Sequence, residues 1–590
     1  MASSPYVSSP AAATSSPFAS LPSSLSKLAA FDSIDWTSKS FATSVLAILI
    51  TLLVAEQTLW RYRKAHLPGH SWQIVRRLSF LPLLGRTRRP VIGQFAESLN
   101  PTMEAYKRSW STPLATVSFI VIASTTEYAR KILNSSTLAE PCLVRSAKQV
   151  LLRAWPFLIN PRLGKTKWWG ICTAENWVFL NGKVHNEYRK GLNSLFTPQA
   201  LQIYLRMQDS IYRKYFRQWV ADPTPEAQPY QMKFRDLNME TSLRVFCGSY
   251  IREEDVKEIS DKYWLITQAL ELVNFPFAFP GTKVWNACRA REVTVKYLMQ
   301  AAAASKKAIA AGKEPDCLLD EWVEEIHSGK VRKYENKEMA LVLLSVSHPP
   351  ASLVRGMTTI FIFTPSLPDA MSSSITFAFQ LLADHPEVLA KIREEQTRVR
   401  AGDLESAMSL EWLEQMPYTN AVTKEVLRYR PPVIMVPYLT KKPFPINDEY
   451  TVPKGTMLIP SFWNVRFPVF LSTSVIPSLT LGTCEQSLHD PAVYPDPEDF
   501  VPERFMPGGA NHGNDKDAKN WLVFGAGAHK CIGQNYVYMH MSAVIGSAAM
   551  LLNWEHERTP ESDEIQIIAT LFPKDGCRLK FTPREDASMI

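Results

Sequence analysis

The chain has 590 residues, of which 46% are hydrophobic, and a formal net charge of +8. This length suits one large domain behind a short leader, or several smaller domains. The eight cysteines show no Cys-x-x-Cys spacing, which argues against a disulfide framework or a zinc site and indicates a reducing compartment. Basic residues cluster near the N-terminus without a nucleic-acid-binding motif, so we expect a membrane or acidic-protein partner and no nucleic acid.

The N-terminal segment is predicted to be a disordered lead followed by a membrane anchor. Residues 1–40 are rich in Ser, Ala and Pro, and residues 41–60 are mostly apolar. A span needs about 20 such residues, and a basic flank is retained in the cytosol. We therefore expect a single-pass anchor over 41–60, a basic, proline-containing hinge over 61–72 and a cytosolic domain over 73–590. The alternative is that 41–60 form a buried helix of a soluble domain.

A short pattern after Gly182 predicts a helix with two basic residues on one face. His185 and Arg189 are four residues apart, so they lie on the same side of a helix. Together they are suited to bind an anionic group. The alternative is an ordinary solvated charged face.

Residues 369–386 are predicted to form one buried helix that ends at Pro386. An acid and two hydroxyl groups, those of Asp369, Ser372 and Ser373, lie at its start, and an apolar run follows. Immediately upstream, Pro365 and Pro368 are expected to interrupt this helix, because proline removes a helix hydrogen bond.

A second helix is predicted to carry an ion pair and to end at two prolines. Glu425 and Arg428 are three residues apart on one helix face, ahead of Pro431. Downstream, Arg504 supplies another guanidinium group. Taken alone, the spacing also fits an exposed surface pair.

The most informative stretch is a glycine-rich loop around Cys531. His529 precedes the cysteine by two positions, and an apolar run with helical spacing follows it. A helix N-terminus favours thiolate over thiol, so we expect the pKa of Cys531 to be lowered there. An anionic sulfur on such a loop is what an axial ligand of haem iron requires. The alternative is an inert structural cysteine.

This loop resembles the haem-binding signature of cytochrome P450, Phe-x-x-Gly-x-(Arg/His)-x-Cys-x-Gly. The five constrained positions are matched by Phe524, Gly527, His529, Cys531 and Gly533. The resemblance implies a mainly α-helical fold with a small β region, the cytochrome P450 fold, behind an N-terminal membrane anchor. It also implies haem b, with its iron bound by Cys531.

The resemblance assigns roles to the earlier patterns as well. It implies that His185, Arg189 and His529 contact the haem propionates. It implies that Glu425, Arg428 and Arg504 form a buried structural network. It gives proton delivery to Asp369, Ser372 and Ser373, with Ala370 in place of the usual threonine.

Within the family, the chain is most similar to fungal sterol C-22 desaturases. The similarity lies in residues 139–142, 176–180, 379–384 and 568–575, and in the alanine at position 370. It implies a C-22(23) double bond formed in a sterol of ergosterol biosynthesis, with O2 and electrons from NADPH–cytochrome P450 reductase. It also implies the endoplasmic reticulum membrane, reductase docking near Lys519 and Lys530, and a side-chain pocket lined by Val433, Ile434, Met435 and Val436.

Two alternatives to desaturation are retained. One is another cytochrome P450 monooxygenase that hydroxylates a sterol or a fatty acid. The other is a non-catalytic protein that binds haem or sterol, because the interruption near Pro365 damages the distal helix.

Four stretches interrupt the family pattern, at residues 73–89, 154–174, 346–368 and 465–486. Residues 465–486 carry almost no charge and no clear periodicity, and compact domains rarely contain such long loops. We interpret the four as retained introns, with real loops of this lineage as the alternative.

Overall fold

A computed structural model gives the fold of the main part of the chain. The described residues are 51, 104–108, 118–123, 126–141, 183–268, 281, 283–330, 333–336, 339–340, 367–403, 405–433, 436, 438–446, 451–460, 488–512, 519–567 and 570–584. The chain divides into Met1–Leu67 and Pro68–Ile590, and the elements below belong to the second unit. The predicted lead, anchor, hinge and extra segments lie outside the described residues, apart from Thr51, Leu367 and Pro368. Over the part of the chain that the structure describes, no helix is long and apolar enough to cross a membrane.

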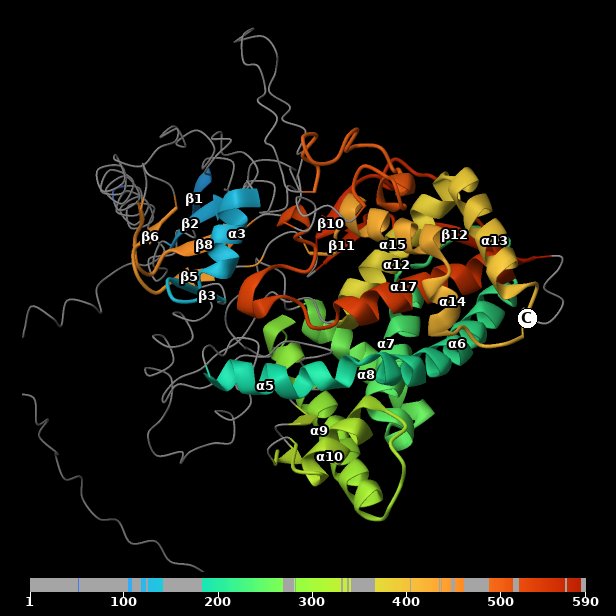
Figure 1. Cartoon of the computed structure of the whole chain (residues 1–590), viewed down its shortest axis with the longest axis horizontal. Helices are drawn as coiled ribbons and strands as arrows, with labels where there is room; N and C mark the ends of the chain where they lie inside the picture. Colours follow the sequence, from blue (N-terminus) through green and yellow to red (C-terminus); the bar gives the residue numbers. More distant parts are fainter. Residues whose placement is uncertain are drawn as a thin grey trace, which may run out of the picture. The chain divides into compact units, whose positions relative to one another are not determined.

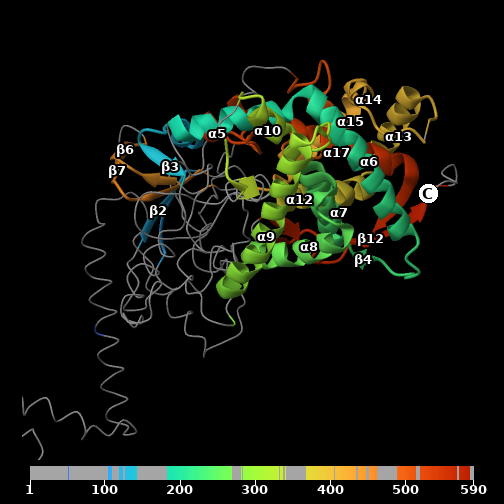
Figure 2. The same cartoon turned by 90° about the horizontal axis from the view of Figure 1, so that it is seen from below.

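Helices make up most of the described part of this unit (Figures 1 and 2). They are α3 (Thr126–Asn134), α5 (Lys183–Asn193), α6 (Pro198–Val220), α7 (Gln231–Cys247), α8 (Glu253–Gln268), α9 (Lys283–Ala310), α10 (Leu318–His327), α12 (Leu367–Asp384), α13 (Pro386–Arg400), α14 (Leu410–Glu414), α15 (Pro417–Tyr429) and α17 (Gln534–Leu551). The 3-10 turns η7 (Ser194–Phe196), η8 (Gly248–Tyr250), η9 (Pro502–Phe505) and η10 (Gly527–His529) connect them.

The β region is small and built from short strands. The five-stranded sheet has the order β1-β2-β8-β5-β3, with β1 (Glu104–Arg108), β2 (Ser118–Ala123), β8 (Met457–Pro460), β5 (Tyr438–Thr440) and β3 (Ala139–Pro141). In it, β2 runs parallel to β8, with Ile120 opposite Met457. The smaller sheets are β4 (Gln228–Pro229) with β12 (Arg578–Pro583) and β9 (Leu552–His556), β10 (Ile565–Ile567) with β11 (Leu571–Pro573), and β6 (Phe444–Pro445) with β7 (Thr451–Val452). The expected mainly helical fold with a small β region is confirmed.

Helix starts follow from local chemistry. Pro198 opens α6, where the Thr197 hydroxyl accepts a hydrogen bond from the Ala200 N–H at 3.4 Å. Pro386 likewise opens α13 directly after α12 ends. Pro368 is the second residue of α12, where a backbone N–H has no acceptor within the helix. The expected interruption of this helix by Pro365 and Pro368 stays a prediction, because Pro365 and the residues just before Leu367 lie outside the described residues.

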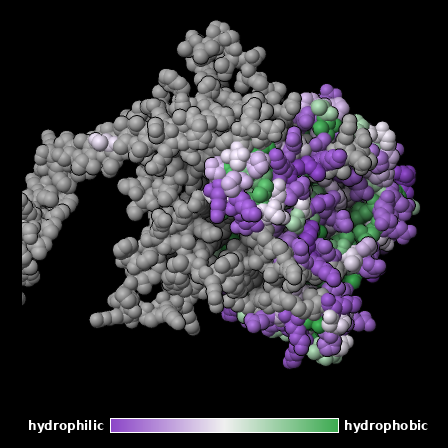
Figure 3. Space-filling model, turned by 60° about the vertical axis from the view of Figure 1, so that its left-hand side comes forward, coloured by the Kyte–Doolittle hydropathy of each residue, from purple (hydrophilic) through white to green (hydrophobic). Residues whose placement is uncertain are grey.

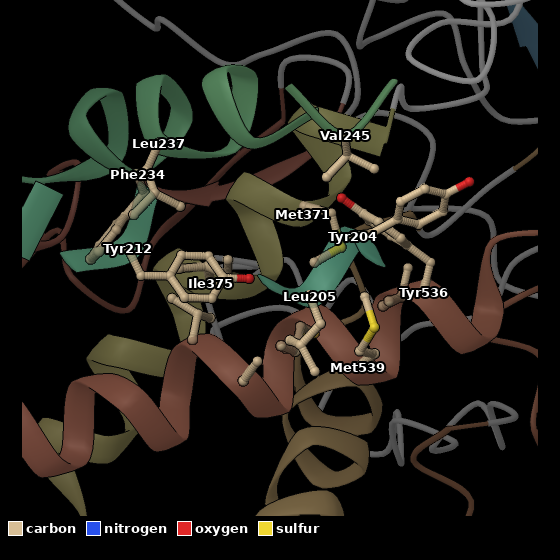
Figure 4. Close-up of a cluster of buried hydrophobic side chains, with 14 of the residues drawn as sticks. Tyr204, Leu205, Tyr212, Phe234, Leu237, Val245, Met371, Ile375, Tyr536 and Met539 are labelled. Carbon is tan, nitrogen blue, oxygen red and sulfur yellow. The ribbon is translucent and has the colours of Figure 1, made fainter. Parts of the chain in front are cut away.

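The core gathers around α17, which is buried along almost its whole length. Figure 4 shows aromatic and aliphatic side chains of α6, α7, α12 and α17 meeting there; they include Leu205, Phe234, Leu237, Met371, Ile375 and Met539. The described part of the surface in Figure 3 is largely hydrophilic. Among the described residues Met232 is the one large hydrophobic side chain that is exposed. Apolar burial therefore drives these helices together.

A buried charge network joins α15 to the coil that precedes the Cys531 loop. Glu425 and Arg428 are both 0% exposed, so the exposed-pair alternative is wrong. Arg428 donates to both Glu425 carboxylate oxygens, at 2.7 and 2.9 Å, and Arg504 donates to the same carboxylate at 3.2 Å. The remaining Arg428 donors reach the carbonyls of Leu488 and Pro497 at 2.9 and 2.8 Å.

Replacing Glu425 by Ala should destabilise the fold by about 3–5 kcal/mol, because Arg428 and Arg504 would remain buried without their carboxylate. The free energy of unfolding from denaturant titration measures this loss. Lys391→Ala is the control, because its ion pair with Glu503 is exposed on the surface. An equal, small effect of both changes would contradict a structural role for the network.

Candidate functional site

The Cys531 loop is closed by its own backbone. The Cys531 N–H donates to the Phe524 carbonyl at 2.9 Å, and the Lys530 N–H donates to the Gly527 carbonyl at 3.2 Å. Gly525 and Gly527 both have φ of +69°, a conformation that side chains rarely adopt. Helix α17 then begins at Gln534, as the apolar periodicity predicted.

Helix α3 packs directly against this loop. A Cβ atom added to Gly527 would lie 2.5 Å from the Leu133 carbonyl oxygen and 2.9 Å from Asn134 Oδ1. Arg130, also on α3, donates to the Lys519 carbonyl at 2.5 Å. Gly527 is therefore required both for its backbone conformation and for the close approach of α3.

Basic side chains from α5 meet the loop. Arg189 donates to the carbonyls of Lys530 and Ala528 at 2.7 and 3.2 Å. The ring centroids of His185 and His529 are 4.3 Å apart. The structure thus brings together His185, Arg189, His529 and Cys531, which the sequence placed in two distant segments.

The electrostatics of the thiol differ from the expectation. Desolvation by the surrounding protein raises the pKa of Cys531, although the Gly533 N–H, Arg189 and Lys530 act in the opposite direction. The predicted lowering of this pKa by the helix N-terminus is therefore wrong for the protein alone, although the Cys531 side chain is exposed. A bound metal ion would reverse the balance, since a coordinating thiol is deprotonated.

The neighbouring basic groups are also affected by burial. The pKa of His185 is lowered by burial and by the charge of Arg189, against a hydrogen bond with Asn186 that raises it. The pKa of Arg189 is lowered by burial, which Cys531 opposes. Both imidazole and guanidinium therefore gain from an anionic partner nearby.

These residues fit a haem group. The thiol on a glycine loop is a suitable iron ligand, and histidine and arginine side chains suit the two propionate carboxylates.

The predicted proton-delivery residues are buried in hydrogen bonds to three other elements. Asp369 forms an ion pair with Arg235 of α7 at 3.1 Å and accepts a hydrogen bond from Thr267 of α8. Ser372 accepts a hydrogen bond from Asn238 of α7 at 3.3 Å. Ser373 donates to the Leu571 carbonyl of β11 at 2.5 Å.

The predicted side-chain pocket is connected to α12 through β11. Leu571 uses its carbonyl for Ser373 and its N–H for the Pro432 carbonyl, at 3.3 Å. Val433 and Val436 are half-buried, while Ile434 and Met435 lie outside the described residues. Leu571 therefore connects the start of this segment, at Pro432, to helix α12.

Sequence reasoning missed the partners on α7. Arg235 and Asn238 are three residues apart and buried in α7, where Gln231, Thr241 and Ser242 are also buried. A buried arginine needs an acid, and this requirement was the available signal. Its partner lies 134 residues away, so spacing alone could not identify it.

Comparisons with known proteins agree with this geometry. The cytochrome P450 family model matches residues 172–466 and 481–581. The C-22 sterol desaturase of Saccharomyces cerevisiae is 38% identical over 94% of this chain and 93% of that protein. A cytochrome P450 monooxygenase of Emericella variicolor is also 38% identical, over 91% and 92%. The solved structure of retinoic acid-bound cyanobacterial CYP120A1 superposes with a TM-score of 0.59 at 20% identity, covering 79% of this chain and 90% of that one. That likeness concerns the fold alone.

Replacing Gly527 by Ala should lower the haem content of the purified protein far more than replacing Gly525 by Ala. Both positions share φ of +69°, but only the Cβ at Gly527 would collide with backbone, and that at Gly525 would meet nothing within 4 Å. The pair thus separates the cost of the conformation from that of the collision. Equal haem content in both variants would show that the approach of α3 does not shape the site.

Proposed function

This chain belongs to the cytochrome P450 family, and from that premise we propose that it forms the C-22(23) double bond of a sterol side chain in ergosterol biosynthesis. The observation that carries the proposal is the Cys531 loop with its basic cluster in a chain that resembles fungal C-22 desaturases over almost its full length. One turnover removes two hydrogen atoms from the substrate. With two electrons from NADPH and two protons, O2 then leaves as two molecules of water.

Cys531 is proposed as the axial thiolate ligand of haem b, with Phe524, Gly527 and Gly533 shaping the loop around it. His185, Arg189 and His529 are proposed to hold the propionates. When bound, the haem supplies the activation of O2 and the removal of hydrogen, and the thiolate ligand favours O–O cleavage.

The distal helix is proposed to deliver protons through its own polar groups. Asp369, Ser372 and Ser373 are the candidates, and Ala370 provides no hydroxyl at the position next to Asp369. The buried environment excludes bulk water, so protons must pass along positioned side chains or ordered water. The segment with Val433, Ile434, Met435 and Val436 is proposed to line the pocket for the sterol side chain.

The remaining proposals concern location and partners. An anchor over residues 41–60 would hold the chain in the endoplasmic reticulum membrane by a single pass, with the hinge 61–72 and the catalytic domain in the cytosol. NADPH–cytochrome P450 reductase would dock its acidic face near Lys519 and Lys530.

Replacing Cys531 by Ala should abolish the red-shifted Soret band that thiolate ligation gives to the reduced carbon monoxide complex. The variant has no thiolate to offer the iron. Cys172→Ala and Cys484→Ala serve as controls and should retain the band. An unchanged band in Cys531→Ala would remove the basis of the proposed site.

The purified chain with reductase, NADPH, O2 and a sterol with a saturated side chain should yield a product lighter by two hydrogen atoms. Mass spectrometry locates the double bond, and omission of NADPH is the control. The equal similarity to a monooxygenase makes hydroxylation the second candidate. A product heavier by one oxygen atom would favour hydroxylation, and haem binding without any product would favour a non-catalytic protein.

We also propose that residues 73–89, 154–174, 346–368 and 465–486 lie outside the conserved body of the domain, as retained introns or loops. In support, the match to the family model leaves out residues 467–480, whereas all of 346–368 falls within the match. Leu367 and Pro368 belong to α12, so the third segment overlaps that helix.

Deleting residues 465–486 should leave the carbon monoxide band intact. The family model's match leaves out residues 467–480, in the middle of this segment. Deletion of residues 488–509, which is equally long and carries carbonyl acceptors of Arg428, is the control and should abolish haem binding. Loss of the band on deletion of 465–486 would contradict the proposal.

A further inference from the structure

Four buried polar side chains form a continuous hydrogen-bonded chain through the apolar core. Tyr212 of α6 lies 2.6 Å from His540 Nδ1, on α17. His540 Nε2 lies 2.8 Å from Asn238 Oδ1, on α7. Asn238 Nδ2 lies 3.3 Å from Ser372 Oγ, on α12. The chain thus reaches from the centre of the core to one of the proposed proton-delivery residues.

The chemistry of the donors gives this chain one direction. Asn238 Oδ1 can only accept, so His540 carries its proton on Nε2 and donates it. His540 Nδ1 is then an acceptor, and the Tyr212 hydroxyl must donate to it. Because this hydroxyl has one hydrogen, the Gln208 side-chain amide 3.1 Å away must turn its N–H toward the Tyr212 oxygen. The Asn238 amide has two hydrogens, of which one goes to the Phe234 carbonyl at 2.9 Å and the other to Ser372 Oγ.

Burial keeps this pattern from changing. Tyr212, Asn238, Ser372 and His540 are all at most 1% exposed, and the His540 ring stacks on Tyr536 with an interplanar angle of 7°. Burial also lowers the pKa of His540 to about 3, so the imidazole stays neutral at physiological pH. A neutral ring with both nitrogens engaged keeps a single tautomer.

This hydrogen-bonded chain restricts the direction of the Ser372 hydroxyl. Because Ser372 Oγ accepts from Asn238, its own hydrogen cannot point toward α7 and is directed to another side of α12. A second bridge between the same helices, from Arg235 to Asp369, lies three residues before this one on both helices. Together the two bridges fix the rotation of α12 about its axis.

We propose that Asn238 and His540 are positioning residues that orient the Ser372 hydroxyl for proton delivery. The inference rests on the proposed function, in which Ser372 belongs to the proton path. Neither residue touches the reacting atoms. Their role is to hold Ser372 as an acceptor on its α7 side.

The test measures the hydrogen peroxide released per NADPH oxidised by the full chain with reductase, O2 and sterol. When protons are not delivered correctly, the electrons from NADPH reduce O2 to hydrogen peroxide and are not used for reaction with the sterol. Ser372→Ala, Asn238→Leu and His540→Phe should each raise this ratio by about threefold to tenfold, a modest share of what positioned proton transfer contributes. Ser374→Ala removes a buried hydroxyl from the same helix, outside the hydrogen-bonded chain, and should leave the ratio unchanged.

Double variants separate positioning from a merely structural role. In the Ser372→Ala background, Asn238→Leu and His540→Phe should produce no further increase, because they act through that hydroxyl. His540→Gln keeps one hydrogen-bond donor and one acceptor. Its ratio of hydrogen peroxide released to NADPH oxidised should therefore be much closer to the wild-type ratio than that of His540→Phe. The carbon monoxide band of each variant checks that haem is bound. If Asn238→Leu loses this band, the peroxide ratios of the His540 variants decide between a positioning and a structural role.

Two results would overturn the inference. One is a further increase in peroxide when His540→Phe is combined with Ser372→Ala. The other is a wild-type ratio in His540→Phe. If the wild-type chain makes no desaturated sterol but the peroxide ratios follow the expected pattern, the proposed function falls and the positioning role stands.

Discussion

The buried carboxylate of Glu425 is the constraint on which the rest of the domain depends. It accepts from Arg428, from Arg504 and from the Val501 N–H at 2.9 Å. The two guanidinium groups in turn use carbonyls of the coil between Leu488 and Asp499. Without water, each donor left unpaired would cost several kcal/mol, so the coil has one acceptable path. In the sequence, this coil precedes the loop that presents Cys531.

The same helix is secured at its other end by α13. Glu395 accepts from the N–H groups of Tyr418 and Thr419, both at 2.8 Å, and so satisfies the first turn of α15. Arg393 of α13 donates to the Ala549 and Leu552 carbonyls at the end of α17. Helix α13 therefore satisfies backbone groups at the start of α15 and at the end of α17.

Polar groups recur in this core at the places where α12 must be oriented. An all-apolar interface would permit α12 to rotate or slide at little cost, because hydrophobic contact has no direction. Arg235 and Asn238 instead bind Asp369 and Ser372, and Leu571 binds Ser373. Each bond is buried, so losing any of them leaves an unpaired polar group. Helix α12 is thereby held from two sides.

The family resemblance predicted the mainly helical class and the small β region, whereas local patterns in the sequence predicted the cysteine loop before α17 and the pairing of Glu425 with Arg428. These local patterns depend on spacing within a few residues, where geometry follows from the helix repeat. Tertiary structure alone decided the burial of the Glu425 network, the contact of α3 with Gly527, and the partners of Asp369 and Ser372 on α7. Those partners are 134 residues away, at a separation where spacing carries no information. It also decided that Pro368 stands in the first turn of α12, and that the pKa of Cys531 is raised in spite of the helix N-terminus. Both outcomes depend on which atoms surround a group once the chain is packed, and local sequence does not contain that information.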